Sequence, residues 1–223
     1  MPIPKSRVRP FPHDRSKLYD LGVILVERFC PANKIVSPNV YPVPEPRWHF
    51  GACAFYRPDT EAERAHFAEH LAKDGYGPGT NICIDLCGRP APHETCRNWS
   101  WPGSDTDRTP YGVLAHELGH HADYLVGGVK GRYWSEYSSE VRAAANERGL
   151  TSYAGENPAE WFAEAFRLFV TNPPLLEALR PRTYHEIGKR FTPVCPTSGD
   201  WVQNLGANVP DRIVTNLRKK VVR

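Results

Sequence analysis

The stretch LAHELGH at residues 114–120 decides most of what this sequence predicts, because it holds an H-E-x-x-H pattern inside an apolar run. Residues four apart project from the same face of an α-helix, so His116 and His120 can bind one metal ion together. Glu117 lies about 100° further round the helix and can reach a water on that ion. The pattern is typical of a zinc site with a base beside it. Two solvated histidines on a helix surface are the alternative for the pattern taken alone.

The residues around this motif predict a helix from 110 to 127. Apolar and polar residues separate onto two sides of it at the helical period. The apolar side holds Leu114, Leu118, Ala122 and Leu125, and the polar side holds His116, His120 and Asp123. Thr109 and Pro110 suit a helix start, and Gly127 with Gly128 suits a helix end. The motif is therefore expected on a rigid, packed element.

A catalytic zinc held by two histidines and a water needs one more protein ligand. Metzincins take it from a longer motif, with a Gly three residues after the second His and a His or Asp three residues further on. Asp123 and Val126 occupy those positions here, which excludes that class. The third ligand is then expected to be a carboxylate from a second helix.

Residues 158–170 predict that second helix. Asn157 followed by a proline suits its start, and Glu160 and Glu164 share one of its faces. Glu160 could instead fold back on the helix cap, and Glu164 could pair with Arg167. The helix is otherwise strongly apolar, so its carboxylates need a partner, which a metal with its histidines would provide. Glu160 is the expected zinc ligand, with Glu164 as the alternative.

Taken together, the two motifs resemble the catalytic domain of the anthrax lethal factor and Pro-Pro endopeptidase group of gluzincins. A similar pair of motifs occurs in the Mlc titration factor proteins. The resemblance covers about residues 110 to 170 and rests on HELGH at 116–120, SYA at 152–154 and NPAEWFAEAF at 157–166. It implies a helix-rich, zincin-like α+β metallopeptidase domain with a small sheet upstream of the motif helix. It also implies one zinc ion, bound by His116, His120 and Glu160.

The same resemblance implies roles for the neighbouring residues. Glu117 becomes the general base that takes a proton from the zinc-activated water and passes it to the leaving amine. Tyr153 becomes the hydroxyl that stabilises the oxyanion, although a plain packing role is its alternative. Glu164 becomes a carboxylate that contacts the metal-binding residues and not the metal itself. Asp123 and Glu164 are expected to accept hydrogen bonds from the outer ring nitrogens of the zinc histidines.

Two further groups of metal-binding residue types have plainer interpretations. The H-x-x-E-H pattern at 66–70 lies on a predicted helix, 59–73, that is polar nearly all round, so two exposed histidines are favoured. Three cysteines lie within fourteen residues of one another, with a histidine among them. They are Cys83, Cys87 and Cys96, with His93. Free thiols are favoured there, and a disulfide or a structural zinc site is the alternative.

Length and composition predict one domain. The chain has 223 residues, of which 40% are hydrophobic, and this is enough for a proper core. Nine of the 22 prolines precede residue 47, so residues 1–46 are expected to be an extended N-terminal segment and 47–223 the single metallopeptidase domain. The net charge of +3 is too small to indicate nucleic acid or a membrane surface as a partner.

Targeting signals and other elements complete these expectations. No apolar run is long enough for a signal peptide core or a membrane span, which favours a soluble and most simply cytoplasmic protein and leaves secretion without a leader open. Residues 81–86 predict a strand that borders the cleft and pairs with an extended substrate. Helices are expected at 135–148, 174–190 in pieces, and 210–221.

The expected function is that of a zinc-dependent endopeptidase whose partner is a peptide or protein substrate. A non-enzymatic or regulatory binding module that keeps the metal fold is the rival. Retention of Glu117 favours catalysis, because a structural zinc site needs no base. Cleavage preference and oligomeric state do not follow from the sequence.

Overall fold

The computed structural model describes residues 16–43, 54–62, 65, 81–85, 110–127, 131–147, 150–171 and 173–194. The helices in chain order are α1 (Ser16–Ala32), α4 (Pro110–Gly127), α5 (Trp134–Tyr137), α6 (Ser139–Ala145), α7 (Pro158–Thr171), α8 (Pro173–Leu179) and α9 (Pro181–Gly188). The strands are β1 (Asn39–Val43), β2 (Ala54–Arg57) and β3 (Asn81–Asp85), and η2 (Tyr153–Gly155) is a 3-10 turn. The coarse class predicted from the sequence, helix-rich α+β with a small sheet before the motif helix, is confirmed.

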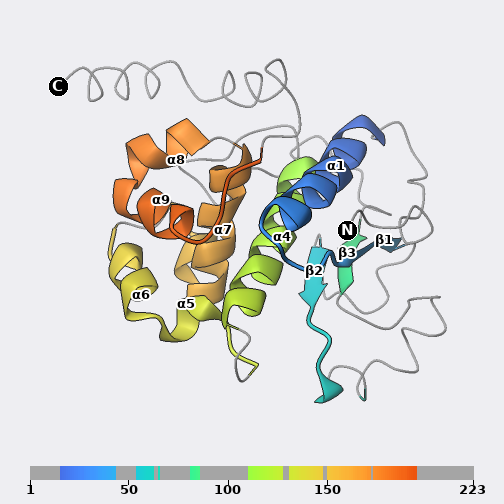
Figure 1. Cartoon of the computed structure of the whole chain (residues 1–223), viewed down its shortest axis with the longest axis horizontal. Coiled ribbons are helices and arrows are strands. Elements are labelled where there is room, and N and C mark those ends of the chain that lie inside the picture. The colour runs from blue at the N-terminus through green and yellow to red at the C-terminus, as the bar shows by residue number, and fades with distance from the viewer. Residues whose placement is uncertain are drawn as a thin grey trace.

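Helix α4 lies in the middle of the molecule, with the sheet on one side and α7 with the later helices on the other (Figure 1). Its bounds agree with the prediction from Pro110 and Gly127. At Gly119 it comes so close to α7 that an added Cβ would lie 2.9 Å from the Cα of Ala163. Four fully buried phenylalanines, Phe29, Phe162, Phe166 and Phe169, are among the largest side chains of the core beside this contact.

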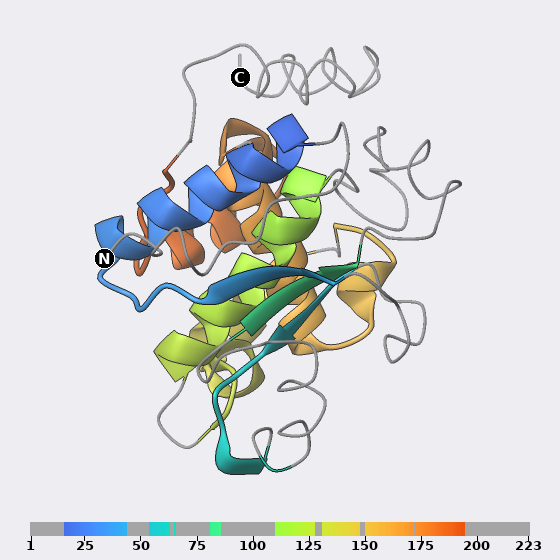
Figure 2. The ribbon, with the colours of Figure 1, turned by 90° about the vertical axis from the view of Figure 1, so that its right-hand side faces the viewer.

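The three strands form one sheet in the order β1-β3-β2, and they lie across α4 (Figure 2). β1 pairs with β3 in parallel and β2 pairs with β3 antiparallel, so that Val40 and Tyr56 both lie opposite Ile82. The expectation that β3 pairs with a substrate is therefore wrong, because both of its edges already carry a strand. Among the described residues, β2 is one of the two edge strands, and it contacts the motif helix α4.

The N-terminal segment is not extended throughout, as the proline count had suggested. Residues 16–32 form α1, which packs against α4, and its Leu25, Val26 and Phe29 are fully buried in the core. The prediction of an extended lead-in outside the domain is wrong for these residues and for β1. No proline stands between residues 13 and 30, so that part of the segment is free to form a helix.

The remaining predictions are met in part. The helix expected at 135–148 is two helices, because Ser138 has an extended backbone and caps α6 by accepting a hydrogen bond from the amide of Val141. The pieces expected at 174–190 are α8 and α9. The histidine pattern at 66–70, most of the helix expected at 59–73, Cys87, His93, Cys96 and the helix expected at 210–221 lie outside the described residues.

No helix in the described ranges combines the length and the apolar character that crossing a membrane would require.

Candidate metal centre

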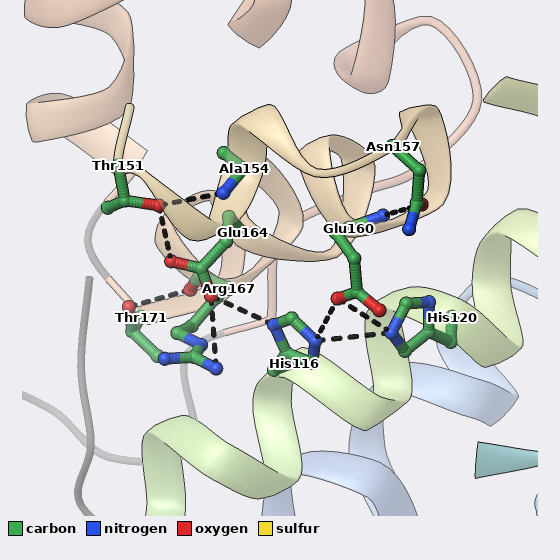
Figure 3. A network of polar contacts seen from close by, with 9 residues as sticks. All are labelled: His116, His120, Thr151, Ala154, Asn157, Glu160, Glu164, Arg167 and Thr171. Atoms are coloured by element: carbon green, nitrogen blue, oxygen red, sulfur yellow. Dashed lines mark hydrogen bonds and ion pairs between the residues drawn. The ribbon is translucent and has the colours of Figure 1, made fainter. Parts of the chain in front are cut away.

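Three side chains from α4 and α7 converge at the centre of the molecule. His116 and His120 lie one turn apart on α4, and Glu160 lies in the first turn of α7. The side-chain oxygen of Asn157 accepts the amide hydrogen of Glu160 at 2.9 Å and so caps α7. The Glu160 carboxylate is not folded back on that cap, and it points to the two histidines (Figure 3).

The donor atoms of these residues form a compact triangle. The distances are 3.0 Å from His116 Nε2 to Glu160 Oε2, 3.3 Å from His120 Nε2 to the same oxygen, and 3.1 Å between the two Nε2 atoms. Ligands of a tetrahedral ion with bonds of about 2.0–2.1 Å lie roughly 3.3–3.4 Å apart. The three residues could therefore hold a metal ion with little movement.

Charge at this point favours a cation. Burial and Arg167 act to lower the pKa of His116, but hydrogen bonds to Glu160 and Glu164 outweigh them and raise it to about 9. Burial opposes ionisation of Glu160, yet the hydrogen bonds from His116 and His120 hold its pKa well below the ordinary value. Positive charge between these groups is thus stabilised, whether a proton or a metal ion carries it.

A buried carboxylate supports His116 from behind. Glu164 is fully buried, and its Oε1 lies 2.9 Å from His116 Nδ1 and 3.0 Å from Arg167 Nη2 (Figure 3). The predicted contact between Glu164 and a histidine of the motif is confirmed. The Arg167 pairing that the sequence allowed as an alternative is present as well, and it is buried rather than exposed. A carboxylate in this place fixes the ring orientation and tautomer of a metal-binding histidine.

Thr151 connects this carboxylate to the turn that carries Tyr153. Its hydroxyl donates to Glu164 Oε2 at 3.2 Å and accepts the amide hydrogen of Ala154 at 3.1 Å. Tyr153 lies in the same turn, η2, and its ring stacks on His116 with 5.6 Å between ring centres. Burial, with Glu160 and Glu117 nearby, raises the pKa of the Tyr153 phenol, which therefore stays protonated and can donate.

The group of His120, Glu160 and Tyr153 borders a cleft of about 450 Å³. It is lined by Ala54, Tyr56, Glu117, His120, Tyr133, Glu136, Tyr153, Asn157, Ala159 and Glu160. Glu117 is 5% exposed, and burial raises its pKa while the positive charges of His116 and His120 oppose that rise. A raised pKa makes a carboxylate a stronger base, and a general base works best when its pKa lies near the working pH.

Asp123 is placed differently from the expectation. Its two carboxylate oxygens accept hydrogen bonds from Ser135, at 2.8 Å from the backbone amide and at 2.5 Å from the hydroxyl. His120 Nδ1 has no hydrogen-bond partner among the described residues. The predicted contact of Asp123 with a zinc histidine is therefore wrong, because its side chain ties α4 to the start of α5. The neighbouring His121 contacts other residues, with its Nε2 at 2.6 Å from the carbonyl oxygen of Val36.

The sequence did not single out four residues of this site, namely Tyr56, Tyr133, Glu136 and Thr151. Tyr56 and Tyr133 both contact the His120 ring, with ring centres 6.4 Å and 6.1 Å away. Burial and the carboxylates of Asp123 and Glu117 raise the pKa of Tyr133, so its phenol is protonated too. None of the four belongs to either motif; packing brings Tyr56, Tyr133 and Glu136 to the cleft and Thr151 to Glu164.

Comparison of the chain with protein-family models found no match, and neither did searches for similar curated proteins and for similar solved structures. The resemblance carried by the two motifs accordingly stays a prediction.

Proposed function

We propose that this protein is a zinc-dependent endopeptidase with a zincin-like domain of the gluzincin type. The observation that carries the proposal is the triangle of His116 Nε2, His120 Nε2 and Glu160 Oε2, at the edge of a cleft that Glu117 also lines. Two imidazoles and one carboxylate are a usual protein ligand set of a catalytic zinc, with a fourth position left for water or substrate. No fourth side chain joins this cluster among the residues that the structure describes.

The residues around the triangle have the properties that peptide hydrolysis requires. Zinc, when bound, supplies a Lewis acid that polarises a carbonyl and makes water more acidic. Glu117 would take the proton of the attacking water and give it to the leaving amine. The Tyr153 phenol would donate to the oxyanion that forms on the scissile carbonyl. Glu164 would accept the Nδ1 proton of His116, which leaves the Nε2 lone pair for the metal.

An extended peptide fits the side of the cleft formed by β2. Ala54 and Tyr56 of this strand line the cleft, and β2 pairs with β3 on one side only among the described strands. A peptide that added to this edge would gain backbone hydrogen bonds independent of its sequence. β2 thus takes the role that the sequence had suggested for β3.

The rival function, a metal-binding module without catalysis, explains less of the site. Such a module has no need of Glu117, whose burial disfavours its charged form. A structural zinc site also prefers four protein ligands to three. Both features are accounted for when the cleft is an active site.

Metal analysis and hydrolysis of a peptide library test the proposal together. The protein purified with zinc should hold about one ion per chain, and His116→Ala or His120→Ala should abolish binding while His66→Ala leaves it intact. Glu117→Gln should retain the zinc and lose hydrolysis by roughly 10²- to 10⁴-fold. Glu140→Gln, an exposed acid on α6, is the control and should behave as wild type. Full turnover in Glu117→Gln, or full zinc in the histidine variants, would refute the proposal.

A further inference from the structure

We infer that Tyr133 is a substrate-binding residue whose phenol hydroxyl donates a hydrogen bond to a backbone carbonyl of the bound peptide. The inference rests on the proposed function and adds a contact to it that neither motif contains. It places a second phenol beside His120, whereas Tyr153 lies beside His116.

The positions of the two tyrosines support this arrangement. Tyr153 stacks on the ring of His116, whereas Tyr133 meets the ring of His120 edge to face, with an interplanar angle of 66°. Both tyrosines line the cleft together with Glu117 and Glu160. A substrate whose scissile carbonyl lay between His116 and His120 would therefore extend past both phenols.

The two hydroxyls differ in their surroundings. Burial and the nearby Glu160 carboxylate raise the pKa of the Tyr153 hydroxyl. The Tyr133 side chain is half-buried, and its hydroxyl has no hydrogen-bond partner within the described part of the chain. A polar group without a partner is costly when a ligand covers it, unless the ligand supplies the bond. Every peptide offers backbone carbonyl oxygens as acceptors, so this donor would serve substrates of any sequence.

Tyr133 is also held firmly in place by its neighbours in sequence. Trp134 is buried and packs edge to face on Phe162 of α7, with 5.8 Å between ring centres. Ser135 is bound through its amide and its hydroxyl to Asp123 of α4. Anchoring of the two following residues fixes the backbone at Tyr133 before a ligand arrives, which lowers the entropy cost of using its hydroxyl.

Two hydroxamate probes of different length test the inference on the zinc-loaded protein. Acetohydroxamate can reach the metal but carries no peptide, and an N-acetyl-tripeptidyl hydroxamate adds backbone carbonyls beside the same metal-binding group. Tyr133→Phe should weaken binding of the tripeptidyl probe by about 3- to 10-fold, the effect of one hydrogen bond, and leave acetohydroxamate unchanged. Dissociation constants from titration calorimetry give this comparison without any turnover.

Tyr124→Phe is the matched control. Tyr124 packs against both Tyr133 and Tyr56 but does not line the cleft, so its variant should bind both probes as wild type does. Equal affinity of wild type and Tyr133→Phe for the tripeptidyl probe would overturn the inference, and so would equal weakening of both probes, which would mean a disturbed metal site. Failure of both probes to bind wild-type protein would instead refute the proposed function itself.

Discussion

Gly119 of α4 and Ala163 of α7 lie so close together that no side chain fits between them, since a Cβ on Gly119 would stand 2.9 Å from Ala163 Cα. Gly119 is the residue between Leu118 and the second histidine of the motif. Its missing side chain lets α7 approach α4, and this approach brings Glu160 within 3.3 Å of both histidine nitrogens. The glycine of the motif is thus part of the metal site without donating to it.

The first prediction concerns this contact. Gly119→Ala should push the helices apart and lower the free energy of unfolding by about 1–2 kcal/mol, because overpacking outweighs the gain of up to about 1 kcal/mol in helix propensity. Zinc affinity should fall as well, since Glu160 moves with α7. Denaturant unfolding and zinc titration measure the two effects. Gly188→Ala is the control, because its Cβ would meet only Phe169 at 3.9 Å; equal behaviour of the two variants would contradict the packing argument.

The second prediction separates the two acids of α7. Glu160→Ala removes a donor of the triangle and should lose most of the zinc in the presence of a mild chelator. Glu164→Gln keeps a side chain of the same shape behind His116 and should weaken zinc binding by roughly 10- to 100-fold, the usual effect of an outer partner. Competition against a chromogenic chelator gives both affinities. Tighter zinc binding in Glu160→Ala than in Glu164→Gln would show that the roles are exchanged.

A third prediction follows from the buried pair of Glu164 and Arg167. Truncating Glu164 to Ala leaves the Arg167 guanidinium buried without this carboxylate, which should cost about 3–5 kcal/mol of unfolding free energy. Glu186→Ala breaks the exposed pair with Lys189 and should cost less than about 1 kcal/mol. Urea unfolding of the metal-free proteins compares the two directly. Similar costs would mean that the Glu164 pair is not buried in solution.

The fourth prediction is that Thr151 acts on the reaction through Tyr153. Thr151→Val removes the hydroxyl that joins Glu164 to the η2 turn, and we expect kcat to fall by about 3- to 10-fold, in line with the loss of one hydrogen bond. Thr151→Ser keeps the hydroxyl and should restore the rate. In a Tyr153→Phe background the effect of Thr151→Val should largely disappear, which a double-mutant cycle of kcat/KM measures. Strict additivity would rule out the coupling.

The last prediction is a pH dependence of stability that comes from Asp123. Burial raises its pKa to about 7, against an ordinary value of 3.8, and the hydrogen bonds from Ser135 oppose that rise only in part. The folded state therefore binds the proton more tightly than the unfolded chain. This contribution to stability is complete below about pH 4 and is lost as the pH rises through about 7.

Asp123→Asn tests the sign, because an asparagine can still accept the Ser135 amide hydrogen and donate to its hydroxyl oxygen. Relative to wild type, the variant should gain up to roughly 3 kcal/mol between pH 5 and pH 8, because over that range wild type loses what remains of this contribution. Urea unfolding at the two values gives the comparison. Parallel stability profiles for the two proteins would show that the Asp123 carboxyl does not titrate in this range.

Local sequence was sufficient for the elements that carry the metal site. The period of apolar residues, with Pro110 and Gly127 at the ends, predicted α4, and Asn157 before Pro158 predicted the start of α7. These signals act within one or two helical turns, so they can be recognised from the local sequence alone. The spacing of His116 and His120 is likewise a property of one helix.

Contacts between distant segments were decided only by the tertiary structure. Asp123 contacts Ser135 rather than a histidine because α5 packs beside α4, and β3 is central because β1 and β2 occupy its two edges. Residues 16–32 were predicted to belong to an extended, proline-rich N-terminal segment, yet their apolar side chains pack against α4 and complete the core. The sequence by itself determined which side chains could bind a metal and on which helices. Their meeting in one triangle, and the choice of Thr151 and Tyr133 as neighbours, depend on how closely those helices pack, which no local pattern encodes.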